Sequence, residues 1–277
     1  MSNLPLYQVD AFTSQVFRGN PAAVCLLSAP LPDATLQAIA AEMNLSETAF
    51  LLRAKDEPWQ ANSSYSLRWF TPKVEVPLCG HATLSAAAVL FEAIGVATEE
   101  LAFHTLSGVL LARRDGARVH LDFPVDPPLP CKAPLDVLAS LGLPEARAAA
   151  YGDITRKLLL ELDTPQAIRE LTPNFGTLLA AESMAQFKGL IVTATGDAPY
   201  DFCSRYFAPW VGINEDPVTG SAHTLLAPYW SAQLHRDTFL AHQASARGGE
   251  LWVSLKSQAR VDIAGEAVIV LEGTLRI

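Results

Sequence analysis

Short apolar runs separated by turn residues fill the first part of the chain. Residues 6–9 and 22–27 are two such runs, and Gly19-Asn20-Pro21 lies between them. Gly, Asn and Pro are typical of tight turns, so this pattern predicts a hairpin-like pair of strands. In 32–43 apolar residues recur at the spacing of one helical face, which predicts an amphipathic surface helix.

Glu47 follows that helix and lies just before the apolar run 49–52. We therefore expect it at a helix-to-strand connection, and such connections commonly carry chemistry. Alternating apolar residues in 64–71 predict a further strand that runs into the turn at Pro72.

The most informative stretch, residues 82–94, is apolar on nearly every side and is closed by Gly95. It predicts a helix that is wholly enclosed by protein. The small-residue turn Cys79-Gly80-His81 opens this helix. Short strands are expected after it at 101–103, 109–113 and 119–123.

Five prolines in 124–134 stiffen the backbone and resist regular pairing, so we place the crossing between two domains there. Beyond it we expect a helix at 134–141 and strands near 157–162 and 189–195. The tail is strand-like, and its last segment, 268–277, is expected to return and complete the sheet of the first domain.

A second helix with apolar residues on many sides, 225–234, follows the small-residue turn Thr219-Gly220-Ser221. Pro228 inside it predicts a kink or a break. A small-residue turn that feeds a buried helix thus occurs once in each half, which indicates two similar domains facing one another. We assign 1–124 with 268–277 to the first domain and 125–267 to the second.

Composition narrows the class of protein. Of the 277 residues, 50% are hydrophobic and 18% are charged, which is ample apolar material for packed cores. The formal net charge of −9 repels phosphate backbones and anionic lipids, so we expect no nucleic-acid or membrane partner. The four cysteines form no C-x-x-C and no export signal is recognised, which favours a cytoplasmic protein.

The helix openings Gly80 and Gly220-Ser221 are the first candidates for chemistry. Helix starts present unpaired N–H groups and a partial positive charge, and small residues let an anion approach the backbone closely. Two such ends at one cleft would hold a carboxylate. The alternative is that these glycines only allow close packing.

Six short motifs occur in the order in which one protein family carries them. They are Asp10-Ala11-Phe12, Gly19-Asn20-Pro21-Ala22-Ala23-Val24, Leu45-Ser46-Glu47-Thr48, Arg68-Trp69-Phe70-Thr71-Pro72, Cys79-Gly80-His81-Ala82-Thr83 and Glu215-Asp216-Pro217-Val218-Thr219-Gly220-Ser221-Ala222. Gln243 with Arg247-Gly248-Gly249 adds a weaker match. The chain closely resembles the PhzF-like isomerases of phenazine biosynthesis, over essentially its whole length.

The resemblance implies the α+β fold of the diaminopimelate-epimerase-like proteins. In that fold each of two similar domains wraps a curled sheet around a central buried helix, and the site lies in the cleft between the domains. A homodimer is also implied by the resemblance alone.

Carried over residue by residue, the resemblance makes Glu47 the acid/base and makes His81 and Asp216 polar pocket residues that assist proton movement. It makes Gly80 and Gly220-Ser221 the helix starts that hold the anion. The implied reaction moves a proton between carbons of a small carboxylate-bearing substrate. A single glutamate can accept and return the proton, since burial raises a carboxyl pKa from about 4.3 toward neutrality.

Each of these residues alone has a structural explanation. Glu47 could be a solvated loop carboxylate or a cap, His81 a packed histidine, and Asp216 a brace for the turn before Pro217. Whether His81 or Asp216 donates a proton stays open. A non-catalytic protein of the same fold that binds a small acid or a protein partner is the alternative function.

Cys79 lies just before a helix start, where a thiolate would be stabilised. The related epimerases and racemases use two cysteines, one from each domain, whereas Asp216-Pro217-Val218-Thr219-Gly220 contains none. Two-thiol racemisation is therefore not expected, and we interpret Cys79 as a small packing residue of the substrate-binding helix start. Catalysis by this one thiol is left as an alternative.

Other chemistries lack their signatures. The chain has no G-x-G-x-x-G, G-x-x-x-x-G-K-[ST], H-E-x-x-H or G-x-S-x-G motif, and its six histidines are scattered without ligand spacing. We therefore predict no cofactor and no metal site. The substrate is not identified by these residues, because family membership does not fix a pathway.

Overall fold

The computed structural model describes residues 3–53 and 58–277, and the chain divides into two compact units. Unit 1 comprises Met1–Asp122 and Ala264–Ile277, and unit 2 comprises Phe123–Ile263. The sequence placed the crossing in the proline-rich segment 124–134, and unit 2 begins one residue before it, at Phe123.

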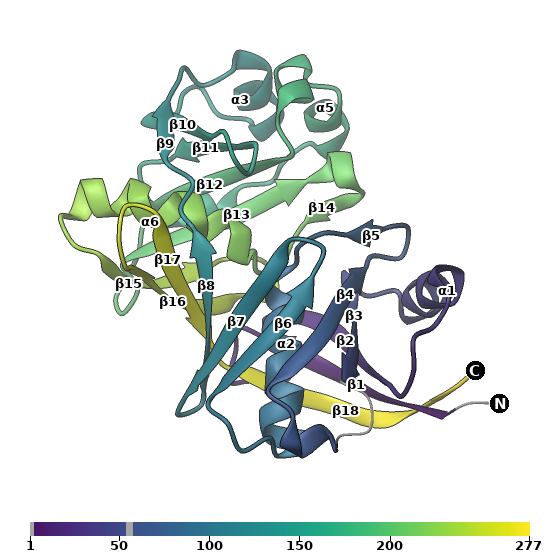
Figure 1. The fold of residues 1–277 in the computed structure, drawn as a ribbon. Coiled ribbons are helices and arrows are strands. Elements are labelled where there is room, and N and C mark those ends of the chain that lie inside the picture. Colours follow the sequence, from purple (N-terminus) through teal and green to yellow (C-terminus); the bar gives the residue numbers. More distant parts are fainter. Residues whose placement is uncertain (1–2, 54–57) are drawn as a thin grey trace. The chain divides into compact units, whose positions relative to one another are not determined.

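Unit 1 is a curled sheet of mixed parallel and antiparallel strands around helix α2, as Figure 1 shows. Its helices are α1 (Asp33–Met43) and α2 (Gly80–Ala88), and α2 continues as the wider π-type turn η2 (Val89–Ile94). Its strands are β1 (Asn3–Ala11), β2 (Asn20–Leu27), β3 (Glu47–Arg53), β4 (Ser64–Phe70), β5 (Glu75–Val76), β6 (Glu100–Thr105), β7 (Gly108–Asp115), β8 (Arg118–Pro124) and β18 (Ala267–Arg276), with a 3-10 turn η1 (Trp59–Ala61) before β4.

Helix α2 is buried from His81 through Ala88. It contacts β1, β2, β3, β7 and β18, so strands cover it on several sides. Its alanines carry little side-chain volume, which lets the strand backbones come close. The prediction of an enclosed helix is therefore confirmed for residues 82–91, whereas Glu92 and Ala93 at the end of η2 are exposed. Helix α1 packs with Leu36, Ile39 and Ala40 on the other side of the sheet, against a cluster that includes Phe50.

Unit 2 repeats this plan around helix α6 (Gly220–Leu234), whose buried residues run from Gly220 to Trp230 with gaps at Ser221 and Pro228. Its strands are β9 (Pro128–Pro130), β10 (Ala148–Gly152), β11 (Lys157–Glu161), β12 (Gly189–Thr195), β13 (Phe202–Ala208), β14 (Ile213–Glu215), β15 (Thr238–Gln243), β16 (Gly249–Leu255) and β17 (Arg260–Gly265). Its short helices are α3 (Leu135–Leu141), α4 (Pro165–Glu170) and α5 (Phe175–Leu179), with 3-10 turns η3 (Glu182–Gln186) and η4 (Pro209–Val211).

The strand pairings of the two units correspond one to one. In unit 1, β1 pairs antiparallel with β2, β2 pairs parallel with β3, and β3 pairs antiparallel with β4. In unit 2, β10 pairs antiparallel with β11, β11 pairs parallel with β12, and β12 pairs antiparallel with β13. β18 lies antiparallel to β1 in unit 1, and β9 lies antiparallel to β10 in unit 2. The internal duplication predicted from two helix openings thus extends over most of each unit.

The same partly buried ion pair fastens β4 to β5 in unit 1 and β13 to β14 in unit 2. Arg68 Nε and Nη2 donate to the two oxygens of Glu75 at 2.7 and 2.8 Å, and Arg205 donates in the same way to Glu215 at 2.7 and 2.9 Å. Each guanidinium also lies over the phenylalanine two residues on, 5.1 Å from Phe70 and 5.0 Å from Phe207. A bidentate pair of this kind fixes the orientation of the guanidinium and the carboxylate as well as their distance. It orders the turn that leads into each central helix.

One detail of the sequence interpretation was wrong, and of the kink or break expected at Pro228 the break is excluded. Strand pairing does occur in the proline-rich segment, because β9 pairs with Tyr151 and its neighbours along one edge, where a missing N–H costs no ladder bond. Helix α6 is not broken at Pro228 but runs through it to Leu234. The return of 268–277 is confirmed, since β18 pairs with β1 from Arg276 to Ala267.

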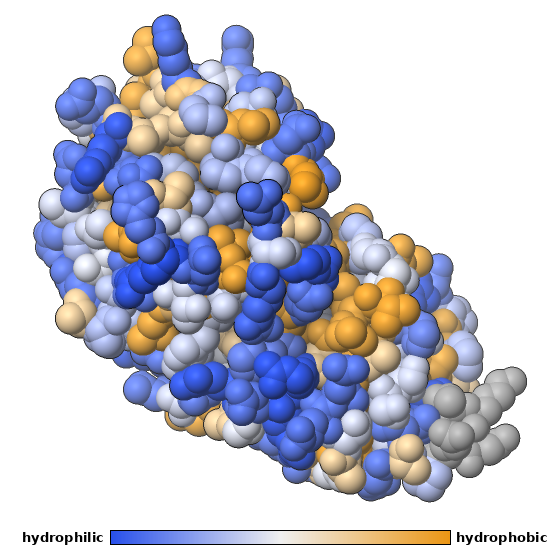
Figure 2. All heavy atoms as spheres, turned by 60° about the vertical axis from the view of Figure 1, so that its left-hand side comes forward, coloured by the Kyte–Doolittle hydropathy of each residue, from blue (hydrophilic) through white to orange (hydrophobic). Residues whose placement is uncertain are grey.

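The surface shown in Figure 2 is mostly hydrophilic, and its apolar residues form several separate groups. No helix in residues 3–53 and 58–277 is long and apolar enough to cross a membrane.

Replacing Arg205 by Ala is expected to lower the free energy of unfolding by about 3–5 kcal/mol. Arg205 is 11% exposed, and its loss would strand the Glu215 carboxylate and the carbonyls of Ile168 and Leu171 to which it also donates. Urea titration followed by circular dichroism measures the change. Arg169→Ala is the matched control, because Arg169 pairs with Asp197 at 43% and 60% exposure and should cost under about 1 kcal/mol. Equal effects of the two variants would contradict the account of the partly buried pair.

Candidate functional site

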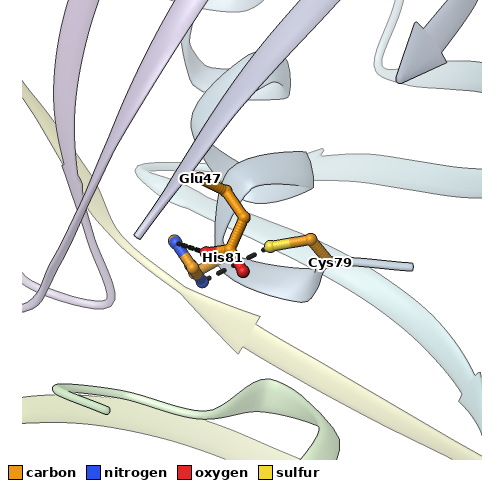
Figure 3. A group of neighbouring side chains, drawn as sticks. All are labelled: Glu47, Cys79 and His81. Carbon is orange, nitrogen blue, oxygen red and sulfur yellow. Dashed lines mark hydrogen bonds and ion pairs between the residues drawn. The ribbon is translucent and has the colours of Figure 1, made fainter. Parts of the chain in front are cut away.

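Glu47, His81 and Cys79 come together in unit 1, with their side chains pointing toward one another (Figure 3). Glu47 is the first residue of β3, where it stands beside Ala22 of the parallel strand β2. His81 lies in the first turn of α2, and Cys79 immediately precedes Gly80, the first residue of that helix. Strand start and helix start thus present an acid, an imidazole and a thiol at one place.

The distances form a continuous chain of contacts. His81 Nε2 lies 3.2 Å from Glu47 Oε2, and His81 Nδ1 lies 3.5 Å from Cys79 Sγ. The Glu47 side chain is 14% exposed and that of His81 is 6% exposed. Burial lowers the pKa of His81 to about 3, so the ring is neutral and carries one proton. The Nε2–Oε2 contact does not have hydrogen-bond geometry, whereas Nδ1 lies within hydrogen-bonding distance of the thiol, and the tautomer decides which of those two atoms donates.

The start of α2 is held by side chains of its own first turns. Thr83 Oγ1 donates to the carbonyl of Cys79 at 2.5 Å, and Ser85 Oγ donates to the carbonyl of His81 at 2.9 Å. Cys79 has an extended backbone at the cap position, and its side chain does not cap the helix. Since the first N–H groups of a helix have no partner within it, they form a place for an anion.

The predicted residues of unit 2 form the corresponding helix start. Asp216 Oδ2 accepts from Thr219 Oγ1 at 2.5 Å, and Gly220 and Ser221 begin α6. Gln243, which is completely buried, accepts from the N–H of Thr219 at 2.8 Å and donates to the carbonyl of Asp216 at 2.8 Å. This amide therefore ties the turn before the helix to β15.

His223 supports the same turn from inside α6. Its Nδ1 lies 2.9 Å from the carbonyl of Thr219, which makes Nδ1–H the donor. Complete burial lowers the pKa of His223 to about 4, so this ring is also neutral near pH 7.

The strand register identifies the residue of unit 2 that is equivalent to Glu47. In the parallel pair β2–β3 of unit 1, Glu47 lies opposite Ala22, and in the equivalent pair β11–β12 of unit 2, Gly189 lies opposite Lys157. The next residues pair with the phenylalanine of the ion-pair motif in both units. Gly189 is thus the counterpart of Glu47, and a Cβ there would lie 2.0 Å from the Tyr206 hydroxyl.

The starts of helices α2 and α6 also differ in which of them carries acid–base side chains. Aligning Gly80 with Gly220 makes Thr219 the counterpart of Cys79 and Ser221 the counterpart of His81. At these three positions unit 2 therefore has no carboxyl, imidazole or thiol group. At these equivalent positions, acid–base side chains occur in unit 1 only.

Sequence reasoning missed Lys157, the first residue of β11. It is 6% exposed, and its Nζ lies 5.6 Å from the centre of the Tyr206 ring. Burial lowers the pKa of Lys157 to about 8, against the attraction of Asp126 and Asp216. A lysine at the start of an otherwise apolar strand was the available signal. Ligand spacing along the chain also does not reveal the cluster of Glu47, Cys79 and His81, because Glu47 lies far from the other two residues in the sequence.

Comparison with known proteins identifies relatives over the full length. A family model described as "Phenazine biosynthesis-like protein" (PhzC-PhzF) matches residues 9–273. The chain is 50% identical to the mouse "Phenazine biosynthesis-like domain-containing protein 1" over 98% of this chain and 99% of that one. It is 47% identical to an "Uncharacterized isomerase" of Pseudomonas aeruginosa, over 99% of each chain.

Solved structures agree with the sequence relatives. A crystal structure titled as a phenazine biosynthesis protein of the PhzF family from Enterococcus faecalis is 42% identical, has a TM-score of 0.91 and covers 100% of both chains. A predicted epimerase from Pseudomonas aeruginosa, at 23% identity and TM-score 0.74, covers 98% of this chain and 99% of that one, and shares the fold. The expected epimerase-like fold class is confirmed.

The buried neutral His223 should make unit 2 less stable in mild acid. A histidine whose pKa is about 4 when folded and about 6.5 when unfolded supplies stability that is complete above pH 6.5 and is lost as the pH falls toward 4. For His223 the loss should reach about 2 kcal/mol at pH 5. Unfolding by urea at pH 7.5 and pH 5 measures it. In His223→Gln, which keeps a donor for the carbonyl of Thr219, the decline should be smaller by that amount. An unchanged decline would contradict the assignment of a neutral buried ring.

Proposed function

The chain belongs to the PhzC-PhzF family of phenazine biosynthesis-like proteins, and on this basis we propose that it is an isomerase acting on a small carboxylate-bearing substrate. In this proposal Glu47 takes a proton from one carbon and returns it to another. The C–H bond breaks, its proton passes to a Glu47 oxygen, and its electron pair forms a new carbon–carbon double bond. The substrate's former double bond then takes the proton back at its far carbon. The balance requires no cofactor.

The observation that carries the proposal is the contact of Glu47 with a neutral imidazole. A cationic ring at 3.2 Å would hold the carboxylate as an anion and make it a weaker base. The neutral His81 instead lets Glu47 alternate between its charged and protonated forms, with Nε2 as a nearby polar group. Acid–base shuttling by one residue needs this freedom.

The difference between the units supports a reaction with one base. Inversion at a carbon by two bases needs an acceptor and a donor on opposite faces. Gly189, at the place equivalent to Glu47, supplies neither. Movement of a proton along one face of the substrate requires only Glu47. For these reasons we favour isomerisation over epimerisation.

We assign binding of the substrate carboxylate to the helix starts at Gly80 and Gly220-Ser221, whose backbone N–H groups suit an anion. His81 and Asp216 are proposed as polar groups that assist proton movement. The substitutions His81→Asn and Asp216→Asn test which of the two residues donates a proton. Replacing the donor should shift one limb of the pH–rate profile, and replacing the other residue should not. The homodimer and the cytoplasmic location stay predictions.

Glu47→Gln is expected to lower the rate of carbon-bound hydrogen exchange by about 10²–10⁴-fold, since the amide keeps the shape but cannot accept the proton. The assay incubates the protein in deuterated water with a panel of small unsaturated amino and hydroxy acids and follows deuterium by NMR. Glu42→Gln, an exposed position on α1, is the control and should behave as the unaltered chain. Full exchange in Glu47→Gln would refute the role of this residue.

The same panel decides between the enzyme and the alternative functions. A non-catalytic protein that binds small acids would show ligand-induced shifts without any exchange. Catalysis through the Cys79 thiol would instead be abolished in Cys79→Ser and retained in Glu47→Gln. We expect exchange that depends on Glu47, and the reverse dependence would favour the thiol.

A further inference from the structure

The Glu47 cluster has the composition of a transition-metal site. One ligand atom from each of Glu47, Cys79 and His81 lies within 4.8 Å of the other two. Within residues 3–53 and 58–277, no other set of three or more such side chains is brought together in this way. Thiolate, imidazole and carboxylate are the donors that zinc takes in proteins, whereas magnesium and calcium take oxygen donors.

The separation of sulfur and nitrogen fits a shared ion. Zinc bonds of about 2.3 Å to sulfur and about 2.0 Å to nitrogen, at a tetrahedral angle, place those atoms about 3.5 Å apart. Cys79 Sγ and His81 Nδ1 are 3.5 Å apart. The pair could therefore hold one ion with little movement, and both residues belong to one helix start, which keeps their spacing fixed.

Glu47 completes the set from a different element. Its Oε2 lies 3.2 Å from the other ring nitrogen, Nε2, and one carboxylate oxygen, the sulfur and one ring nitrogen lie within 4.8 Å of one another. To share an ion on the Sγ–Nδ1 side, the Glu47 side chain has to bring an oxygen to about 3.4 Å from Nδ1, the separation of oxygen and nitrogen ligands of zinc. Three protein ligands leave a fourth position for water or a small ligand.

The charges also balance. Metal binding needs a neutral imidazole and the release of one proton from the Cys79 thiol. A divalent cation with one thiolate and one carboxylate has no net charge, which reduces the cost of placing it among buried groups.

We propose that Glu47, Cys79 and His81 bind a zinc-type divalent cation, and that the bound ion prevents Glu47 from acting as a base. The binding site stands on the three ligands alone. Its inhibitory effect rests on the proposed function, because it matters only if Glu47 moves protons. Free zinc-type ions would then switch the protein off reversibly, and a chelator would switch it on.

Cobalt(II) is the probe for binding, since it takes zinc sites and reports its ligands by absorption. Tag-free protein treated with a chelator is titrated with Co²⁺, and we expect one equivalent to produce a thiolate-to-cobalt charge-transfer band that Zn²⁺ abolishes. Cys79→Ser should lose the band, and His81→Asn and Glu47→Gln should bind at least about tenfold more weakly. Cys131→Ser, which alters a half-exposed cysteine of unit 2, should bind as the unaltered chain.

Absence of the band, or its survival in Cys79→Ser, would overturn the site. If Cys79→Ser does not fold, as judged by circular dichroism, the other two ligand variants decide in its place. Exchange in deuterated water separates the two proposals, because stoichiometric Zn²⁺ should abolish it and a chelator should restore it. Cobalt binding without any exchange would leave the site intact and refute the proposed isomerase, whereas exchange that zinc does not affect would refute the inhibition alone.

Discussion

Both units depend on enclosing a helix among strands, and this constraint determines where polar groups can stand. A helix buried along its length must satisfy its polar side chains from within, as Thr83 and Ser85 do in α2 and His223 does in α6. Only its first turn presents N–H groups that the helix itself does not use. The helix start is therefore the place where an enclosed helix can meet a ligand, and the Arg–Glu pairs beside β5 and β14 set the direction from which the chain enters it.

Much of this arrangement could be predicted from the sequence, because its determinants are local. The apolar surface of 82–94 indicated the enclosed helix, and small residues before it marked its start. Glu47 was found as a residue next to an apolar strand and by family resemblance. Its contact with His81 could not be derived, since strand register and helix position set it, and both depend on residues distant in the chain. Lys157 was missed because burial of a charge depends on its neighbours.

Comparison of the two units shows how a duplicated framework can become specialised. The Arg–Glu pair, the phenylalanine under it and the glycine at the helix start are the same in both. Among the residues that differ are Glu47, Cys79 and His81, whose counterparts in unit 2 are Gly189, Thr219 and Ser221. Gly189, against the Tyr206 hydroxyl, leaves no room for a side chain where unit 1 has Glu47. In this chain the two units thus share a framework that packing constrains and differ in the side chains of the Glu47 cluster.

The pairing of β18 with β1 has a consequence for biosynthesis. Because one of the two strands that pair with β1 consists of residues 267–276, the sheet of unit 1 stays incomplete on the ribosome until that segment has been made. Unit 2 is continuous in sequence and can fold first, while the nascent N-terminal segment waits with an open edge that invites wrong partners. A stalled or prematurely terminated translation product would therefore present that edge to chaperones and to other nascent chains.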